Sequence, residues 1–222
     1  MEDKLRIRPT VLLPLRERSV FVNHYFKQGG IGGVFVPGYT RLASAEEVDV
    51  EIVFAKEQVT VHSRGIIRWK RITDQRNLPA GVGVEFVESE RHTRDLLLEF
   101  TQGRAVTLTK RRTRRYPAML EIEYASNSVF LTDITDDLSR DGASILTNHE
   151  VEVGDLILMR FKVPGQSNGI EVKCEVRWRQ LDGRKGFGVR FIFDRPGAER
   201  RVRELIEEVK HQQAQLFGVP TP

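Results

Sequence analysis

The chain has one cysteine among its 222 residues, Cys174, so an internal disulfide is excluded. Cys174 alternates with Val172 and Val176, which indicates a buried strand position and not a reactive thiol. A lone thiol is typical of a reducing compartment. No apolar run has the length of a membrane-spanning helix, and Met1–Arg8 carries charges where a secretion signal would be apolar. We therefore expect a cytoplasmic protein.

Motifs of common enzymes are also missing. The sequence contains no H-E-x-x-H, no G-x-S-x-G and no P-loop, and its five histidines are scattered. No paired Cys or His suggests a metal site. Asp133, Asp136 and Asp137 cluster, but no neighbouring motif gives them a catalytic role. We predict a protein that binds a ligand, has no cofactor or metal and is not an enzyme.

Composition is that of a soluble globular protein, with 40% hydrophobic and 30% charged residues. The net charge of +4 comes from 35 basic and 31 acidic residues, which permits an anionic partner without requiring one. The local excess in Lys110–Arg115 is more informative than the total, because five of its six residues are basic.

The chain repeats itself at a spacing of about half its length. Three blocks recur in the same order, which indicates two copies of one fold. The matching blocks are Gly32–Val36 and Gly142–Leu146, Ile66–Lys70 and Glu175–Arg179, and Gly81–Phe86 and Gly186–Phe191. Trp69 and Trp178 in the second block are expected to be core or rim aromatics, and the Gly-x-Gly pairs to allow close packing of strands.

Each copy shows short alternating segments followed by a charged segment with apolar residues at helical spacing. Strands are predicted at 48–54, 58–69 and 81–86 in the first copy and at 118–124, 129–134, 142–147, 156–163, 170–180 and 186–193 in the second. Helices are predicted at 88–102 and 195–217, with Pro196 in the first turn of the second. This pattern predicts a mainly β protein with two tandem six-stranded β-barrels, each followed by a helix. The predicted domains are 1–102 and 111–222, with a linker at 103–110.

Two motifs in the second copy can contact a ligand that has phosphates and purine edges. Arg111 and Arg115 form R-x-x-x-R, and arginine presents a planar fork of donors that suits both groups. Asp137, Ser139 and Gly142 form D-x-S-x-x-G, which we expect to be a tight turn. The aspartate can accept hydrogen bonds from guanine, and the serine can donate to a phosphate or hold the turn. The glycine can let the chain bend. Taken alone, the second motif is also compatible with an ordinary turn, and the basic run with a solvated linker or a nucleic-acid patch.

Together, in this order and with the Gly-x-Gly strand downstream, the motifs resemble those of the PilZ domain, a bacterial receptor module for cyclic di-GMP. The resemblance covers Arg111 to about Phe193 and implies a six-stranded barrel whose basic lead-in folds over the ligand, often as an intercalated dimer. It further implies that Arg111 and Arg115 contact guanine and phosphate, that Asp137 and Ser139 contact a guanine, and that Gly142 shapes the turn. The number of bound nucleotides stays open.

The first copy departs from this pattern. Aligned on Gly32, its turn has Lys27 in place of the aspartate and Gly29 in place of the serine, and the arginines before its first strand are two positions apart rather than four. We predict that the first copy does not bind cyclic di-GMP and instead offers a partner-binding or dimerisation surface. His24, Tyr25 and Phe26 could lie on that surface or be ordinary loop and core residues.

The leading functional hypothesis is a signalling adaptor. Cyclic di-GMP would bind the second barrel, order residues 103–115 and change the arrangement of the two barrels, and a protein partner would respond. The resemblance implies an output such as motility or biofilm formation. The alternative is a nucleic-acid-binding protein that uses the basic 110–115 loop; few aromatics for base stacking lie near it beyond Tyr116.

Overall fold

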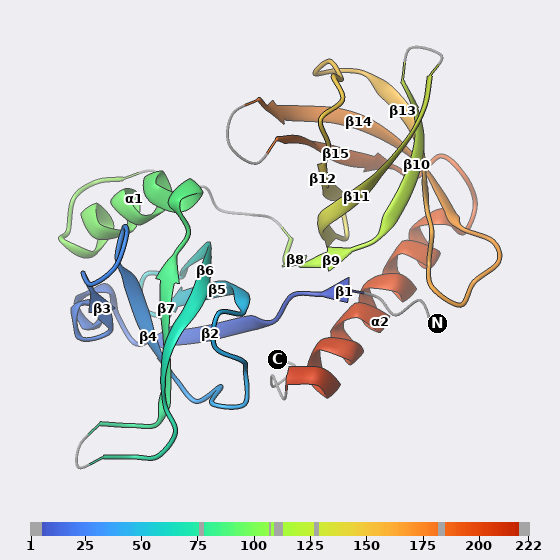
Figure 1. Cartoon of the computed structure of the whole chain (residues 1–222). Coiled ribbons are helices and arrows are strands. Elements are labelled where there is room, and N and C mark those ends of the chain that lie inside the picture. The colour runs from blue at the N-terminus through green and yellow to red at the C-terminus, as the bar shows by residue number, and fades with distance from the viewer. Residues whose placement is uncertain are drawn as a thin grey trace. The chain divides into compact units, whose positions relative to one another are not determined.

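The computed structural model describes residues 6–75, 78–106, 108, 113–126, 129–181 and 185–217. It divides into two compact units (Figure 1). The N-terminal unit comprises the described residues of Arg8–Arg111 and Gln213–Pro222, and the C-terminal unit those of Met1–Ile7 and Arg112–Gln212. The prediction of a mainly β chain with a helix after each sheet is confirmed. The boundaries 1–102, 103–110 and 111–222 remain a prediction about separable domains.

The N-terminal unit contains one six-stranded sheet. The strands are, in spatial order, β2 (Thr10–Leu15), β5 (Glu47–Phe54), β6 (Val59–Arg71), β7 (Gly81–Phe86), β4 (Gly33–Pro37) and β3 (Tyr25–Phe26). All neighbours are antiparallel except β2 and β5, which are parallel. Within the described residues no ladder joins β2 to β3, so the sheet is a half-barrel. The short helices η1 (Arg18–Asn23) and η2 (Glu88–Glu90) and the helix α1 (Arg91–Thr101) complete the unit.

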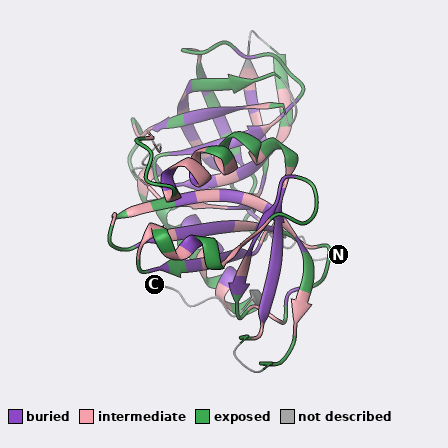
Figure 2. Ribbon diagram, turned by 90° about the vertical axis from the view of Figure 1, so that its left-hand side faces the viewer, coloured by how far each residue is buried: buried purple, intermediate pink, exposed green. Residues whose placement is uncertain are grey.

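Alternation of apolar and polar side chains explains how this sheet covers its core. Val48, Val50, Ile52 and Phe54 on β5 are fully buried, because every second side chain of a strand points to the same face. Leu97 and Phe100 of α1 belong to the same buried cluster. Figure 2 shows buried and exposed positions following one another along the strands.

The sheet of the C-terminal unit closes on itself. Its strands are, in order, β10 (Glu121–Ser126), β13 (Leu156–Phe161), β14 (Ile170–Gln180), β15 (Gly186–Ile192), β12 (Gly142–Leu146), β11 (Val129–Ser139) and β8 (Arg115–Tyr116). A further pairing of β10 with β11 makes the first six a closed barrel, which leaves no free edge among them. The short strands β1 (Arg6–Ile7) and β9 (Ala118–Met119) form a separate pair, and the helix α2 (Ala198–Phe217) follows the barrel.

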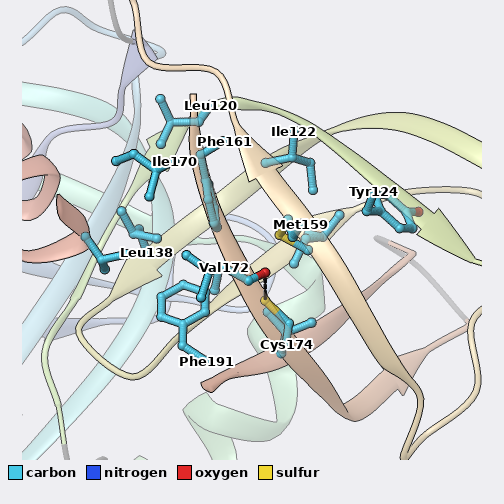
Figure 3. Packing of buried hydrophobic residues seen from close by; sticks show 14 of the residues in the cluster. Leu120, Ile122, Tyr124, Leu138, Met159, Phe161, Ile170, Val172, Cys174 and Phe191 are labelled. Carbon is cyan, nitrogen blue, oxygen red and sulfur yellow. Dashed lines mark hydrogen bonds between the residues drawn. The ribbon is translucent and has the colours of Figure 1, made fainter. Parts of the chain in front are cut away.

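The interior of the closed barrel is filled by apolar side chains (Figure 3). Tyr124 and Phe187 meet edge to face at a centroid distance of 5.6 Å, and the Tyr124 hydroxyl donates to Asp133 at 2.8 Å. Cys174 is completely buried, as expected. It packs in the barrel core, and burial raises the pKa of its thiol to about 12.

Two predicted helix starts are wrong. The first predicted helix is two elements, since η2 ends at Glu90 before α1 begins. The second begins at Ala198, so Pro196 precedes the helix instead of lying in its first turn. Gly197, with a φ of 79°, has the left-handed backbone that ends the preceding turn. Neither α1 nor α2, as far as they are described, is long and apolar enough to cross a membrane.

The sequence repeat is a repeat of backbone irregularities as well. A β-bulge precedes Trp69 on β6, and another precedes Trp178 on β14. The bulges place the indole rings over Gly83 and Gly188, where an added Cβ would lie 2.1 Å from the ring in both cases. Both tryptophans are 38% exposed. The tryptophans therefore lie at the rim, as predicted, whereas Gly83 and Gly188 make room for an indole ring and not for a neighbouring strand.

Candidate functional site

The D-x-S-x-x-G motif is mostly strand. Asp137 and Ser139 lie in the last residues of β11, and the turn itself is limited to Arg140 and Asp141. The prediction that the aspartate and serine lie on the turn is therefore wrong. The strand continues this far because a β-bulge after Thr135 re-aims it and because β8 and β12 pair with it on both sides.

Arg115 lies in β8 directly opposite Ser139, and its side chain reaches Asp137. Its Nη1 atom donates to both carboxylate oxygens of Asp137, each at 3.1 Å, and to the hydroxyl of Ser144 at 2.7 Å. The side chains of Arg115 and Asp137 are 30% and 19% exposed, so the pair is accessible from solvent. The second arginine of one motif and the aspartate of the other thus meet in one site.

Ser139 and Gly142 have structural roles in the ligand-free protein. The Ser139 hydroxyl is buried and donates to the Gly142 carbonyl at 3.0 Å, which closes the turn. Gly142 is not in the left-handed region, so the expectation that it bends the chain is wrong. An added Cβ at Gly142 would lie 2.1 Å from the Val189 carbonyl oxygen, so glycine lets β12 approach β15.

Arg111 falls outside the described residues, as do the other residues of 109–112. Of the basic run, Thr113 to Arg115 are described. The Arg114 guanidinium lies 5.6 Å from the centre of the Tyr116 ring, and the Lys210 ammonium of α2 lies 5.3 Å from it. These cation–π contacts stabilise the chain on either side of Arg115.

Asp137, Ser144, Gly188 and Trp178 face one another across four strands of the barrel. Directly paired residues of a sheet project from the same face. The Trp178 ring covers Gly188 and the Arg115 guanidinium contacts Ser144, so the Asp137 carboxylate, this guanidinium and the partly exposed indole follow one another across the face. A face with an acceptor at one side and an aromatic ring at the other suits a planar base.

A second row beside the first adds charged groups. Arg190 on β15 and Arg177 on β14 both donate to Glu175, at 2.6 and 2.9 Å. The hydrogen bond from Arg190, followed by that from Arg177, lowers the pKa of Glu175. The described residues contain no cluster of His, Cys, Asp and Glu able to hold a metal ion.

Sequence reasoning missed Ser144 and the closeness of Trp178 to the motif. The signal for Ser144 was its position two residues after Gly142 on the same strand, since alternate residues share a face. Trp178 is 41 positions from Asp137 in the sequence, and only the order of the strands brings them to one row.

The corresponding face of the N-terminal unit is built differently. Glu85 and Arg190 are equivalent positions of the repeat. Gly33 pairs with Glu85, and Gly142 pairs with Arg190. The equivalent of Gly142 is therefore Gly33 and not Gly32. Phe26 is then the equivalent of Ser139, and His24, whose carbonyl accepts from Phe35 at 2.7 Å, takes the place of Asp137. The alignment that matched the motif to Lys27 and Gly29 is therefore wrong, because the loop between β3 and β4 is longer.

Aromatic rings fill this N-terminal face. Phe35, at the position of Ser144, stacks on Trp69 at 5.5 Å and 7°, and Phe26 lies 5.9 Å from the same indole. The Arg71 guanidinium covers Phe35 at 5.1 Å. Tyr25 packs on the core and stacks on Phe21 at 5.8 Å. His24, Tyr25 and Phe26 are all half-buried.

Comparison with known proteins gives one family. The PilZ domain model matches residues 109–208. No curated protein sequence matches the chain. Among solved structures, the chain is similar to the PilZ domain of CeSA from a cellulose-synthesizing bacterium, with 20% identity, a TM-score of 0.37, and 44% of this chain and 99% of that chain covered.

Longer structures are similar at lower identity. The inhibitor of motility MotI/DgrA of Bacillus subtilis has 14% identity and a TM-score of 0.41, with 87% of this chain and 95% of that chain covered. MrkH of K. pneumonia, solved as a complex with c-di-GMP, has 10% identity and a TM-score of 0.45, with 89% and 92% covered.

The family match spans both motifs, the closed barrel and the first half of α2. Residues 109–208 of this chain thus match the PilZ domain family.

Proposed function

We propose that this protein is a cyclic di-GMP receptor whose binding site is the outer face of the C-terminal barrel around Arg115 and Asp137. One observation carries the proposal: the second arginine of R-x-x-x-R and the aspartate of D-x-S-x-x-G, 22 positions apart, are in direct contact on a solvent-accessible face of a PilZ domain. Arg115 and Asp137 belong to different motifs and are far apart in the sequence, so the fold brings them together.

The chemistry of the two groups fits a guanine nucleotide. The Asp137 carboxylate can accept from the two adjacent donors, N1–H and N2–H, of a guanine base. The Arg115 guanidinium can donate to a phosphate or to guanine O6 and N7. Arg111, on the lead-in, is proposed as a second donor of this kind. Ser139 and Gly142 belong to the proposed site through the turn that they hold.

The Trp178 indole supplies an aromatic surface on the same face of the barrel as Asp137. Its 38% exposure leaves ring area for a base to cover. Stacking of a base on an aromatic side chain contributes roughly 1–3 kcal/mol and does not depend on the identity of the base. Selectivity for guanine therefore has to come from Asp137 and the arginines.

Beyond binding, we propose that the protein is an effector without catalytic activity. Arg111 and Arg115 directly follow the predicted linker, 103–110, so a ligand held by these arginines would order residues 103–115. Ligand can change the arrangement of the barrels only by binding one arrangement more tightly. A protein partner on the N-terminal barrel would respond, with motility or biofilm formation as the proposed output.

The test is isothermal titration calorimetry of the full chain with cyclic di-GMP, with cyclic di-AMP and GMP as competitors. We expect saturable binding that is selective for cyclic di-GMP and at least roughly 100-fold weaker in Arg115→Ala, since the variant loses a charge-assisted contact in a partly buried site. Arg195→Ala, which removes an arginine paired with Glu171 elsewhere in the unit, is the matched control and should bind as the wild type. Binding that cyclic di-AMP competes for equally well would contradict the proposal.

A further inference from the structure

Ser144 provides Arg115 with the shortest of its described contacts. Its hydroxyl oxygen accepts from Arg115 Nη1 at 2.7 Å, against 3.1 Å for each oxygen of Asp137. The residue itself is 6% exposed and lies on β12 between Asp137 and Gly188. A hydroxyl fixed in the barrel wall therefore holds the guanidinium independently of the carboxylate.

We infer that Ser144 is a positioning residue of the ligand site, which keeps Arg115 docked on the barrel when the ligand engages Asp137. The inference rests on the proposed function. In the ligand-free structure both carboxylate oxygens of Asp137 accept from one nitrogen of Arg115. A guanine that donates to Asp137 competes for those oxygens, and the Arg115 contact to Asp137 weakens. The Ser144 contact does not compete with the base.

The geometry of the guanidinium supports this division of roles. All contacts of Arg115 with the described side chains use Nη1. A guanidinium has five N–H donors in a planar fork, so anchoring one nitrogen leaves Nη2 and Nε for the ligand. Anchoring also fixes the plane of the fork, which reduces the side-chain entropy lost when ligand binds.

The N-terminal unit provides an internal comparison. At the position of Ser144 it has Phe35, and at the position of Asp137 it has His24, so the anchoring hydroxyl and the carboxylate are both replaced. Phe35 stacks on Trp69, whereas Ser144 accepts a hydrogen bond from Arg115. The residue at this position thus decides whether the face holds an arginine or an aromatic stack.

Three variants of the full chain test the inference by calorimetry with cyclic di-GMP. Ser144→Ala removes the acceptor and should weaken binding about 10-fold. Ser144→Thr keeps the hydroxyl and should bind within about threefold of the wild type. Ser144→Phe, which copies the N-terminal unit, should abolish binding while the thermal unfolding of the protein stays close to that of the wild type.

A double-mutant comparison separates positioning of Arg115 from other effects. In the Arg115→Ala background, Ser144→Ala should change affinity less than about twofold, because residues that act through one another are not additive. An equal loss in both backgrounds would mean that Ser144 contacts the ligand or supports the fold, and would overturn the inference. Wild-type-like binding by Ser144→Ala would also overturn it.

Nuclear magnetic resonance of the ligand-free protein gives a readout that does not depend on cyclic di-GMP. With ¹⁵N-labelled arginine, hindered rotation of the Arg115 Nη groups, assigned with Arg115→Lys, should be present in the wild type and in Ser144→Thr and lost in Ser144→Ala. Unchanged rotation in Ser144→Ala would overturn the anchoring. Failure of the wild type to bind would instead refute the proposed function, and is seen before any variant is compared.

Discussion

Phe35 on β4 and Ser144 on β12 occupy the same position in two equivalent strand pairs, each opposite a glycine that a tryptophan ring covers. The phenylalanine stacks on its tryptophan, and the serine binds Arg115. The equivalent faces of the two sheets thus differ in chemistry, one being aromatic and the other polar. The difference explains why we expect only one of the two units to bind a nucleotide.

A single binding site is the first prediction. Asp137→Ala should reduce the affinity for cyclic di-GMP by roughly 100-fold or more, because the guanine donors lose a charged acceptor. No second, weaker site should remain, since His24, Phe26 and Phe35 offer no carboxylate at the equivalent positions. Calorimetry measures both quantities. Asp194→Ala, at an exposed carboxylate beside Lys173, should bind as the wild type. Residual binding in Asp137→Ala that a second substitution, Arg115→Ala, does not weaken would point to a site in the other unit.

Glycine substitutions should separate stability from binding. Gly142→Ala and Gly33→Ala each place a Cβ 2.1 Å from a carbonyl oxygen of the neighbouring strand. Each should lower the free energy of unfolding by about 1–3 kcal/mol, because the strands have to move apart. Denaturant titration measures this loss.

The two glycine variants should differ in their affinity for cyclic di-GMP. Gly142→Ala should weaken binding of cyclic di-GMP, since it disturbs the turn that Ser139 closes, and Gly33→Ala should leave the affinity unchanged. A loss of affinity in Gly33→Ala of the same size would show that general destabilisation, and not the site, is being measured.

Tryptophan fluorescence should report the ligand through one residue. Trp178 shares a row with Asp137, whereas Trp69 lies under Phe35 in the other unit. Saturating cyclic di-GMP should therefore change the emission of Trp69→Phe and not that of Trp178→Phe. The opposite pattern would place the ligand on the N-terminal unit.

Stability should decline in alkaline solution. Burial raises the pKa of Cys174 to about 12, and burial followed by the hydrogen bond to Asp133 raises the pKa of Tyr124. In the unfolded chain these groups lose their protons near pH 9 to 10, while the folded protein keeps them. The contribution of these two groups to the free energy of unfolding should thus be constant below pH 8 and should fall above pH 9, by at most about 1.4 kcal/mol per pH unit for each group.

Chemical denaturation between pH 7 and pH 11 measures this decline. Cys174→Val keeps the packing and removes one titrating group, so its curve should fall less steeply above pH 9 than that of the wild type. Equal slopes in both proteins would mean that the thiol ionises in the folded state.

The sequence was sufficient for the class of fold and for the repeat, since alternation within strands and the Trp and Gly-x-Gly blocks are local. It was insufficient for the longer-range geometry. The parallel pairing of β2 with β5 and the bulge that extends β11 through Ser139 depend on tertiary contacts. The longer loop between β3 and β4 shifted the alignment of the first copy, because Gly32 and Gly33 are adjacent and the sequence does not distinguish them.

Within the site, the sequence identified Arg115 and Asp137 by their motifs but not the contact between them. Ser144 carries no motif, and its role follows from the ladder that sets it beside Asp137. The motif also identified Gly142. Glycine is needed there because a Cβ would meet the Val189 carbonyl across the sheet, and not because a turn needs its backbone angle. The roles of residues that act through neighbours on other strands can be predicted only when the strand order is known.

The most direct test of the central claim is a crystal structure of the full chain with cyclic di-GMP. We predict a guanine edge on the Asp137 carboxylate, Arg115 on a phosphate or a second guanine edge, and the contact of Arg115 Nη1 with Ser144 retained. A nucleotide bound elsewhere, with the pair of Arg115 and Asp137 unchanged, would contradict the account.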